Sequence, residues 1–298
     1  MRREACYWDR DFETRPWAWI EAWQAQQLAA MLDALPERSE FYRERLAGAG
    51  RRVGLRGYWV GRGGRLPSLD MLEQLPFTTR DELRDAQAQS PPGRPLGPQQ
   101  AVPQEYLVQV VCSAGAYYGL TRHDQEVWSD AIAAAFWTAG LRPDDVVRLS
   151  LPADGWPQAD GLRRLGATVA WLGGCAPPGL QVTAVVAGDG VRRLDRVRRT
   201  MGAADVLAAM WSECGAGGGM HFSAAKYVIA ELVEPTAGAR LAWGEGVAGE
   251  LVYTTFDRDA TPVLRYRSDC QVEVTATRCP CGRTSPRVSP TGTTPGCW

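Results

Sequence analysis

The sequence is poor in the two residue types that most often act as bases or nitrogen nucleophiles. Lys226 is the only lysine among 33 basic residues, and His123 and His221 are the only histidines. Lysine and histidine chemistry is therefore confined to three positions. The formal net charge is −1, so no overall field favours nucleic acid or another polyanion.

Long apolar runs are also missing. No run reaches the ~18 residues that a membrane-spanning helix needs. The N-terminus is acidic and aromatic where a signal peptide would be apolar. Hydrophobic residues make up 45% and charged residues 22%, which is typical of a globular protein. Eight cysteines in 298 residues are too few and too scattered for a disulfide scaffold. We expect a cytoplasmic protein without a membrane or nucleic-acid partner.

The first 200 residues predict helices followed by an α/β layer. Apolar spacing predicts helix over residues 14–48, broken at Pro36, and a Gly/Arg-rich loop over residues 49–66. Strand-type runs then alternate with helical segments, which predicts an α/β layer with some parallel pairing. The strand-type runs are residues 106–112, 146–151, 167–172 and 181–186, and a helix is expected over 124–139. The arginines of residues 192–199 are interpreted as one exposed helix face.

The pattern changes after residue 225. Four short strand-type runs joined by Gly-rich turns predict an antiparallel meander or small barrel. These runs are residues 226–233, 249–255, 263–266 and 271–275. We predict an α/β core with a helical N-terminal region over residues 1–225 and a β-rich subdomain over 226–298, packed as one unit. The last ten residues are expected to be frayed.

Several short blocks are similar to the phenylacetate-CoA ligase branch of the adenylate-forming enzymes. They occur in the order of that family: YWD at 7–9, SEFYR at 39–43, LPFTTRDELR at 75–84, GELVYTT at 249–255, PVLRYRS at 262–268 and CPCGRT at 279–284. The resemblance implies the large N-terminal domain of such an enzyme. The family's mobile C-terminal domain, with its catalytic lysine, is expected to be absent because the sequence stops at Trp298.

The ATP motifs of that family are eroded in this chain. The Gly/Thr/Ser-rich loop whose backbone N–H groups hold phosphates is replaced by the run CSAGAYYGLT at 112–121. Cys270 stands where the family has a ribose-binding aspartate, and Asp269 precedes it. Glu213 keeps the place of the magnesium-binding glutamate. We therefore regard binding of ATP and Mg²⁺ as doubtful.

Four residues carry the spacing of a structural zinc site. Cys214 and His221 flank a glycine run, and Cys279 and Cys281 form a CPCG knuckle; the family has a Cys and a His at this spacing together with its own knuckle. Three thiolates and one imidazole make a closed tetrahedral set, which leaves no position for a reactive water. The alternative is four unlinked residues, three of them ordinary buried thiols.

The resemblance also supplies candidates for an active site. The candidate catalytic residues are Cys270, Asp269, Glu213, Cys112 and His123, and the candidate substrate-binding residues are Ser113, Tyr117, Tyr118, Trp137, Trp211, Arg265 and Arg267. A thiol near the former phosphate loop could accept an acyl group if its pKa is lowered. The plainer interpretation is that the cysteines and aromatics are core residues and that His123 is a surface residue.

Three functions remain open. The first is ATP-independent transfer of an acyl or aryl group, supplied as a CoA or carrier-protein thioester, to an amine, thiol or hydroxyl in a biosynthetic pathway. The second is a surviving ligase that makes an acyl adenylate from ATP and a carboxylic acid. The third is a non-catalytic scaffold or partner subunit. A homodimer is possible.

Overall fold

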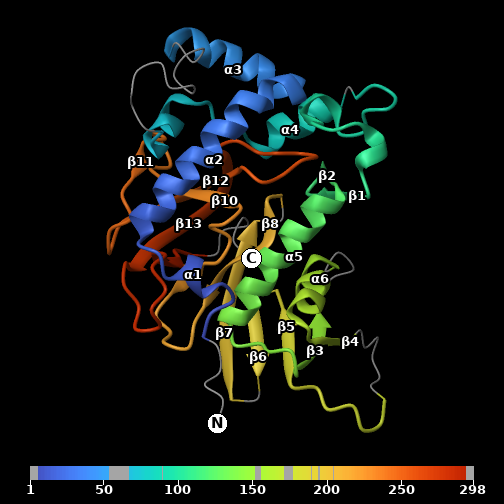
Figure 1. The fold of residues 1–298 in the computed structure, drawn as a ribbon, viewed down its shortest axis with the longest axis vertical. Coiled ribbons are helices and arrows are strands. Elements are labelled where there is room, and N and C mark those ends of the chain that lie inside the picture. Colours follow the sequence, from blue (N-terminus) through green and yellow to red (C-terminus); the bar gives the residue numbers. More distant parts are fainter. Residues whose placement is uncertain are drawn as a thin grey trace.

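A continuous twelve-stranded sheet forms the frame of the described molecule (Figure 1). The computed structural model describes residues 6–53, 67–88, 90–151, 156–170, 177–188, 190–193, 195–203 and 205–292. The strand order is β11-β10-β12-β13-β14-β9-β8-β7-β6-β5-β3-β4. A mixed α/β fold, as predicted, is therefore confirmed.

Among the named strands that the structure describes, parallel pairs occur at one end of this sheet, and a single parallel bridge joins Thr78 to Tyr266 elsewhere. At that end of the sheet β3 (Val146–Ser150) pairs in parallel with β4 (Thr168–Ala170) and with β5 (Ala184–Ala187). The next strands, β6 (Gly190–Arg193), β7 (Arg196–Ala203) and β8 (Leu207–Glu213), continue the sheet in antiparallel fashion. The expected parallel layer is thus present but short.

The C-terminal strands pair in antiparallel fashion as expected, but one strand over Tyr266–Ala276 stands where two runs, 263–266 and 271–275, were expected. The C-terminal strands are β9 (Met220–Phe222), β10 (Val228–Val233), β11 (Arg240–Leu241), β12 (Ala248–Thr255), β13 (Tyr266–Ala276) and β14 (Arg287–Pro290). Strand β9 pairs with β8 on one side and with β14 on the other. Hydrogen bonding is therefore continuous across the expected boundary at residue 225, and the division into two parts stays a prediction.

The helices cover the sheet and extend beyond one of its ends (Figure 1). They are α1 (Arg10–Glu13), α2 (Trp17–Arg38), α3 (Glu40–Val53), α4 (Arg80–Gln87), α5 (Arg122–Thr138) and α6 (Trp156–Leu165), with 3-10 turns η1 (Leu69–Gln74), η2 (Gly97–Gln99) and η3 (Gln104–Tyr106). Thr79 and Thr121 each begin a helix with a complete capping box, which satisfies N–H groups that the first turn leaves free. Pro36 lies in the last turn of α2, which ends two residues later.

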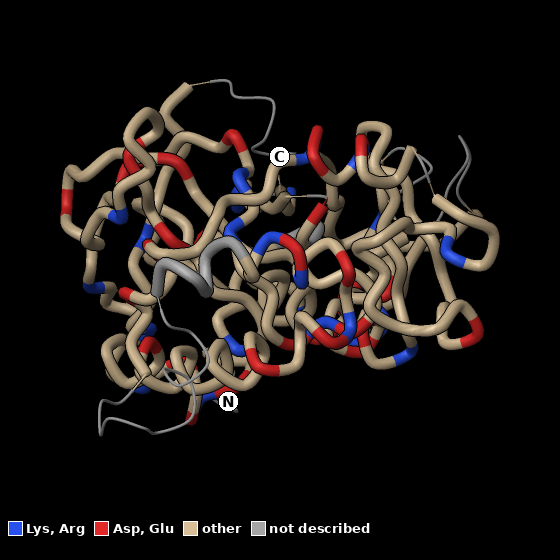
Figure 2. The backbone as a smooth tube through the Cα atoms, turned by 90° about the horizontal axis from the view of Figure 1, so that it is seen from above, with Lys and Arg blue, Asp and Glu red and all other residues tan. Residues whose placement is uncertain are grey.

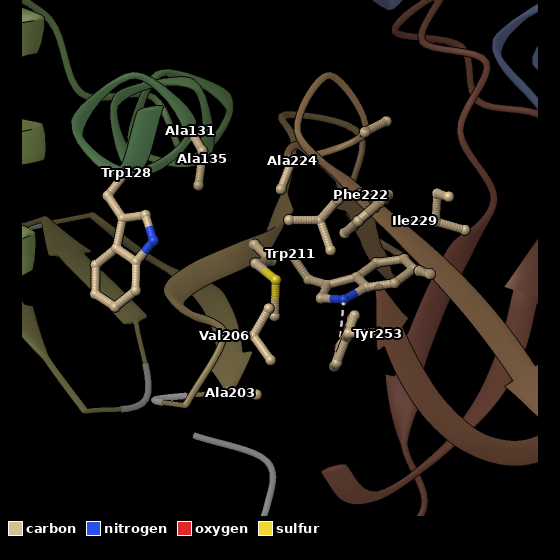
Figure 3. Packing of buried hydrophobic residues seen from close by; sticks show 14 of the residues in the cluster. Trp128, Ala131, Ala135, Ala203, Val206, Trp211, Phe222, Ala224, Ile229 and Tyr253 are labelled. Atoms are coloured by element: carbon tan, nitrogen blue, oxygen red, sulfur yellow. Dashed lines mark hydrogen bonds between the residues drawn. The ribbon is translucent and has the colours of Figure 1, made fainter. Parts of the chain in front are cut away.

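The core centres on Trp211 of β8 (Figure 3). Its ring centroid lies 4.7 Å from that of Phe222 and 6.2 Å from that of Trp243. Its indole Nε1–H donates to the hydroxyl of Tyr253 at 3.0 Å, so burial leaves no polar group unpaired on this ring. Helix α5 packs against strand β8 and against helix α6.

One expected element is wrong. The arginine-rich stretch of residues 192–199 is not a helix face but the β6–β7 hairpin, with Val191 opposite Arg198 and Arg193 opposite Arg196. Arginine favours helices only weakly, and pairing with β5 and β8 on either side outweighs that preference. The expected loop over residues 49–66 also begins late, because α3 continues to Val53.

Other expectations concern residues outside the described ranges. Residues 54–66, the end of the run at 171–172 and residues 293–298 lie outside the described residues. Within the described ranges, no helix has the length and apolar character to cross a bilayer. Acidic and basic residues are intermixed along the backbone in Figure 2, in keeping with the small net charge.

Candidate functional site

The structure brings the four expected metal ligands together around β9, in the middle of the strand order. Cys214 directly follows β8, His221 lies on β9, and Cys279 and Cys281 lie in the loop between β13 and β14. Their ligand atoms all lie within 4.8 Å of one another. The Sγ atoms of Cys214 and Cys279 are 3.6 Å apart, and Cys281 Sγ is 3.4 Å from His221 Nε2.

Neighbouring groups orient these ligands. The other imidazole nitrogen of His221, Nδ1, lies 3.1 Å from Ser285 Oγ, which leaves Nε2 directed at the cluster. Arg283 Nη1 lies 3.8 Å from Cys281 Sγ, and Glu13 holds the same guanidinium group at 2.6 Å. The hydroxyl of Tyr7 donates to the carbonyl of Cys281 at 2.7 Å, so the N-terminus is tied to the knuckle.

The donor set fits a tetrahedral zinc ion in type and size. A Zn–S bond of about 2.3 Å implies sulfur–sulfur edges of about 3.8 Å, close to the separations of these ligand atoms. Hydrogen bonds from the Cys214 thiol and from His221 lower the pKa of Cys281, and the same contact raises the pKa of Cys214. One thiolate is therefore already favoured, and metal binding requires the thiolate form.

The segment that replaces the phosphate loop is a tight hairpin. Strands β1 (Gln109–Ser113) and β2 (Ala116–Leu120) are joined by Ala114 and Gly115 alone, with φ of 46° and 84°. Two positive φ values at the centre of a two-residue turn are typical of a type I′ hairpin. Such a turn is too short to surround a triphosphate with backbone N–H groups.

The side chains of the β1–β2 hairpin differ in their exposure to solvent. Cys112 pairs with Tyr117, and both side chains are exposed, whereas Tyr118 is 1% exposed. Ser113 is half-buried at the end of β1. The predicted acyl-accepting and substrate-binding roles of these residues remain predictions.

A bulge displaces the residues expected to replace the ribose aspartate. Strand β13 pairs Cys270 with Leu251 but Arg267 with Val252, so Ser268 and Asp269 bulge out of the ladder. Asp269 has φ 57° and an exposed side chain, and its N–H donates to Glu250 at 3.1 Å. Cys270 is 2% exposed, and its sulfur lies 3.6 Å from Met201 Sδ. The catalytic role expected for Cys270 stays a prediction.

Glu213 is engaged by an arginine of the neighbouring strand. Arg199 on β7 donates to its carboxylate through Nε at 3.0 Å, through Nη2 at 2.7 Å and through its backbone N–H at 2.9 Å. Any metal-binding role of Glu213 therefore competes with this ion pair.

The two arginines of the RYRS block are held in place by glutamates. Arg265 is 2% exposed and forms a two-point contact with Glu231, with Nε and Nη2 at 3.2 and 3.0 Å from the two carboxylate oxygens. Arg267 donates to Glu250 through Nε at 3.0 Å. Both guanidinium groups stack on Phe77, at 4.1 and 5.4 Å from the ring centroid. These contacts hold both arginines within the fold, and their expected substrate-binding role stays a prediction.

The remaining predicted residues lie apart from one another. His123 is on the surface, with Nε2 2.7 Å from Asp257, and this hydrogen bond raises the pKa of the imidazole. Trp211 lies in the core, and Trp137 packs edge-on against Trp8 at 5.6 Å. The structure does not gather these three side chains into one pocket.

Sequence reasoning missed a buried polar cluster between the family-like blocks. Asp205, in the turn between β7 and β8, is fully buried and accepts hydrogen bonds from Arg80 at 2.8 and 2.5 Å and from the hydroxyl of Tyr266. Burial and the Asp205 charge together raise the pKa of Tyr118 and of Tyr266. Arg80 and Tyr266 belong to the quoted blocks, but nothing in the sequence singled out Asp205.

Comparison with known proteins points to one group of enzymes. No family model matches the chain. It is 26% identical over 337 residues to a phenylacetate-coenzyme A ligase of Thermus thermophilus, covering 94% of this chain and 71% of that protein. It is also 26% identical over 261 residues to a phenylacetate-coenzyme A ligase of Pseudomonas putida, covering 68% of this chain and 57% of that protein.

A solved structure agrees in fold. An open conformation of 2-hydroxyisobutyryl-CoA ligase, in complex with 2-HIB-AMP and CoA, superposes with a TM-score of 0.77 at 21% identity, covering 97% of this chain and 72% of that chain. The same ligase in a postadenylation state gives a TM-score of 0.76. The sequence blocks and the curated relatives make the chain similar to phenylacetate-coenzyme A ligases, and it shares its fold with 2-hydroxyisobutyryl-CoA ligase.

Proposed function

We propose that the protein acts on an acyl or aryl carboxylic acid as a ligase-type enzyme. The observation that carries this proposal is the likeness to a phenylacetate-CoA ligase along 94% of the chain. In the adenylating reaction, a carboxylate oxygen attacks the α-phosphorus of ATP and pyrophosphate leaves. The thiol of CoA then attacks the acyl carbon, AMP leaves, and the thiol proton goes to a base.

A second candidate is transfer from a preformed acyl thioester without ATP. Two features favour it: the turn between β1 and β2 has only two residues where a phosphate loop is expected, and Arg199 already pairs with Glu213, the residue expected to hold magnesium. In that reaction an amine, thiol or hydroxyl attacks the thioester carbonyl and the CoA or carrier thiol leaves. Positioning of the two reactants supplies much of the rate enhancement.

We further propose that Cys214, His221, Cys279 and Cys281 hold a structural Zn²⁺. Their ligand atoms lie within 4.8 Å of one another, and Ser285 and Arg283 support two of them. The ion would join the end of β8 to the loop before β14.

Assays with and without ATP separate the two reactions. The protein, with its metal content measured, is incubated with a panel of aryl and short-chain carboxylic acids, CoA and MgATP, and AMP release is followed. Acid-dependent AMP release that Glu213→Gln abolishes supports the ligase. A matched Glu105→Gln variant, altered at an exposed turn residue, should retain it.

The second arm uses aryl-CoA thioesters and hydroxylamine or small amines without ATP. Protein-dependent release of free CoA in this arm, together with no AMP release in the first arm, supports the transfer reaction and overturns the adenylating one. Activity in neither arm contradicts both enzymatic proposals and leaves the scaffold interpretation.

A further inference from the structure

A cleft of about 550 Å³ opens beside the metal cluster and is used by none of the chemistry above. Its walls come from the end of α5 and the loop after it, the β6–β7 hairpin, the loop after β8, and the CPCG knuckle. This volume is in the range of sites for small molecules. The cleft is therefore large enough for a ligand of nucleotide size.

The lining of this cleft is rich in arginine. Five lining residues are arginines and two are carboxylates: Arg142, Arg193, Arg196, Arg198 and Arg283, with Asp144 and Asp145. Two of the arginines are already committed to acids. Arg193 pairs with the buried Asp145 at 2.8 Å, and Arg283 pairs with Glu13 at 2.6 Å. These two pairs belong to the fold.

Arg196 and Arg198 differ from those pairs. They lie two residues apart on β7, so their side chains project from the same face of the strand. Arg198 donates through Nη1 to the backbone carbonyl of Cys214, and that contact cancels no charge. Arg196 meets Asp195 at 3.4 Å, with both side chains more than half exposed, so this pair is weak. Both guanidinium groups can donate to an anion.

Other lining residues can contact the parts of a nucleotide-sized ligand that are not phosphate. Asp144 is exposed and forms no ion pair with a described residue, so its carboxylate can accept hydrogen bonds from hydroxyl or amino groups. Trp137, Ala139 and Pro280 add apolar surface. Guanidinium groups match phosphate oxygens in geometry as well as charge.

We propose that this cleft binds a phosphate-bearing small molecule of nucleotide size, with its phosphates on Arg196 and Arg198 and its hydroxyl or amino groups on Asp144. The proposal does not depend on the acyl chemistry. Cys214 and Cys281 also line the cleft, so a bound ligand would cover one side of the metal cluster.

Titration calorimetry with defined anions tests this proposal. Pyrophosphate, ADP and adenosine 3′,5′-bisphosphate are titrated into metal-loaded protein at low and at moderate salt. We expect dissociation constants below about 100 μM, or about −5.5 kcal/mol, that weaken as salt rises. Arg198→Gln and, separately, Arg196→Gln should weaken binding about tenfold. Arg163→Gln on α6, whose exposed pair with Asp160 lies outside the lining, should not.

Further variants keep the outcomes distinct. Because Arg198 also contacts the Cys214 carbonyl, the Arg196→Gln variant separates loss of binding from local disturbance of the metal cluster. Tighter binding of ADP than of pyrophosphate, lost in Asp144→Asn, supports recognition of the nucleoside; equal affinity overturns that part. Absence of binding, or equal loss in Arg163→Gln, overturns the proposal. Loss of binding in Arg80→Gln would place the ligand in the polar cluster at Asp205 instead.

Discussion

Arg265 and Glu231 form an ion pair almost completely removed from water, with side chains 2% and 1% exposed. Burial raises the pKa of Glu231 although Arg265 opposes that shift. Leu75 contributes a carbonyl at 3.0 Å from Arg265 Nη1, so the guanidinium group is satisfied on two sides. The pair holds the strand that carries the RYRS block against β10.

We expect Glu231→Gln to destabilise the protein by about 3–5 kcal/mol, because it leaves the Arg265 charge buried without its counter-charge. Urea unfolding followed by tryptophan fluorescence measures the change. The double variant Glu231→Leu with Arg265→Met should recover much of the loss. A single variant as stable as the wild type would show that the pair contributes little.

The surface pair of His123 and Asp257 makes a pH-dependent contribution to the free energy of unfolding. The hydrogen bond to Asp257 raises the pKa of His123 in the folded state. The protonated imidazole therefore stabilises the fold below the unfolded pKa of about 6.5, and this term is lost as pH rises through the folded value. We expect His123→Gln to lower the free energy of unfolding by less than about 1 kcal/mol at pH 5.5 and to have no effect at pH 8.5. Equal effects at both pH values would contradict the assignment.

At the scale of elements, local signals located most helices and strands. The helix expected over residues 124–139 is α5, which Thr121 begins with a capping box. The arginine-rich β6–β7 hairpin was missed because its strands exist only through pairing with β5 and β8. Five arginines within residues 192–199 do not distinguish an exposed helix face from an exposed strand.

The β6–β7 hairpin depends on one glycine. Gly190 has φ 144°, and a Cβ there would lie 2.1 Å from the carbonyl oxygen of Arg198. We expect Gly190→Ala to destabilise the protein by roughly 2–4 kcal/mol, because backbone atoms of the paired strand cannot move aside cheaply. Gly188→Ala is the matched control, since a Cβ there meets nothing within 4 Å. Thermal unfolding of both variants checks this, and equal midpoints would refute it.

At the scale of the whole molecule, the proposed zinc ion joins segments about 65 residues apart in the chain. We expect Cys279→Ser, or removal of metal by a chelator, to lower the thermal midpoint by roughly 5–10 °C. Cys112→Ser, at an exposed hairpin position, should leave it unchanged. Elemental analysis should find one zinc per chain in the wild type. Metal-free protein with an unchanged midpoint would exclude a structural zinc.

The sequence by itself indicated the resemblance to phenylacetate-CoA ligases, the mixed α/β class and the identity of the four clustered Cys and His residues. Those features depend on short sequence blocks whose order and spacing are retained along the chain. Only the tertiary structure decided what surrounds each candidate. In the structure Glu213 pairs with Arg199, Asp269 lies on a β-bulge, and Cys270 is buried. The tertiary structure also assembled Asp205 with Arg80 and lined a cleft with arginines from separate segments. Such contacts join residues far apart in sequence, so no local pattern encodes them.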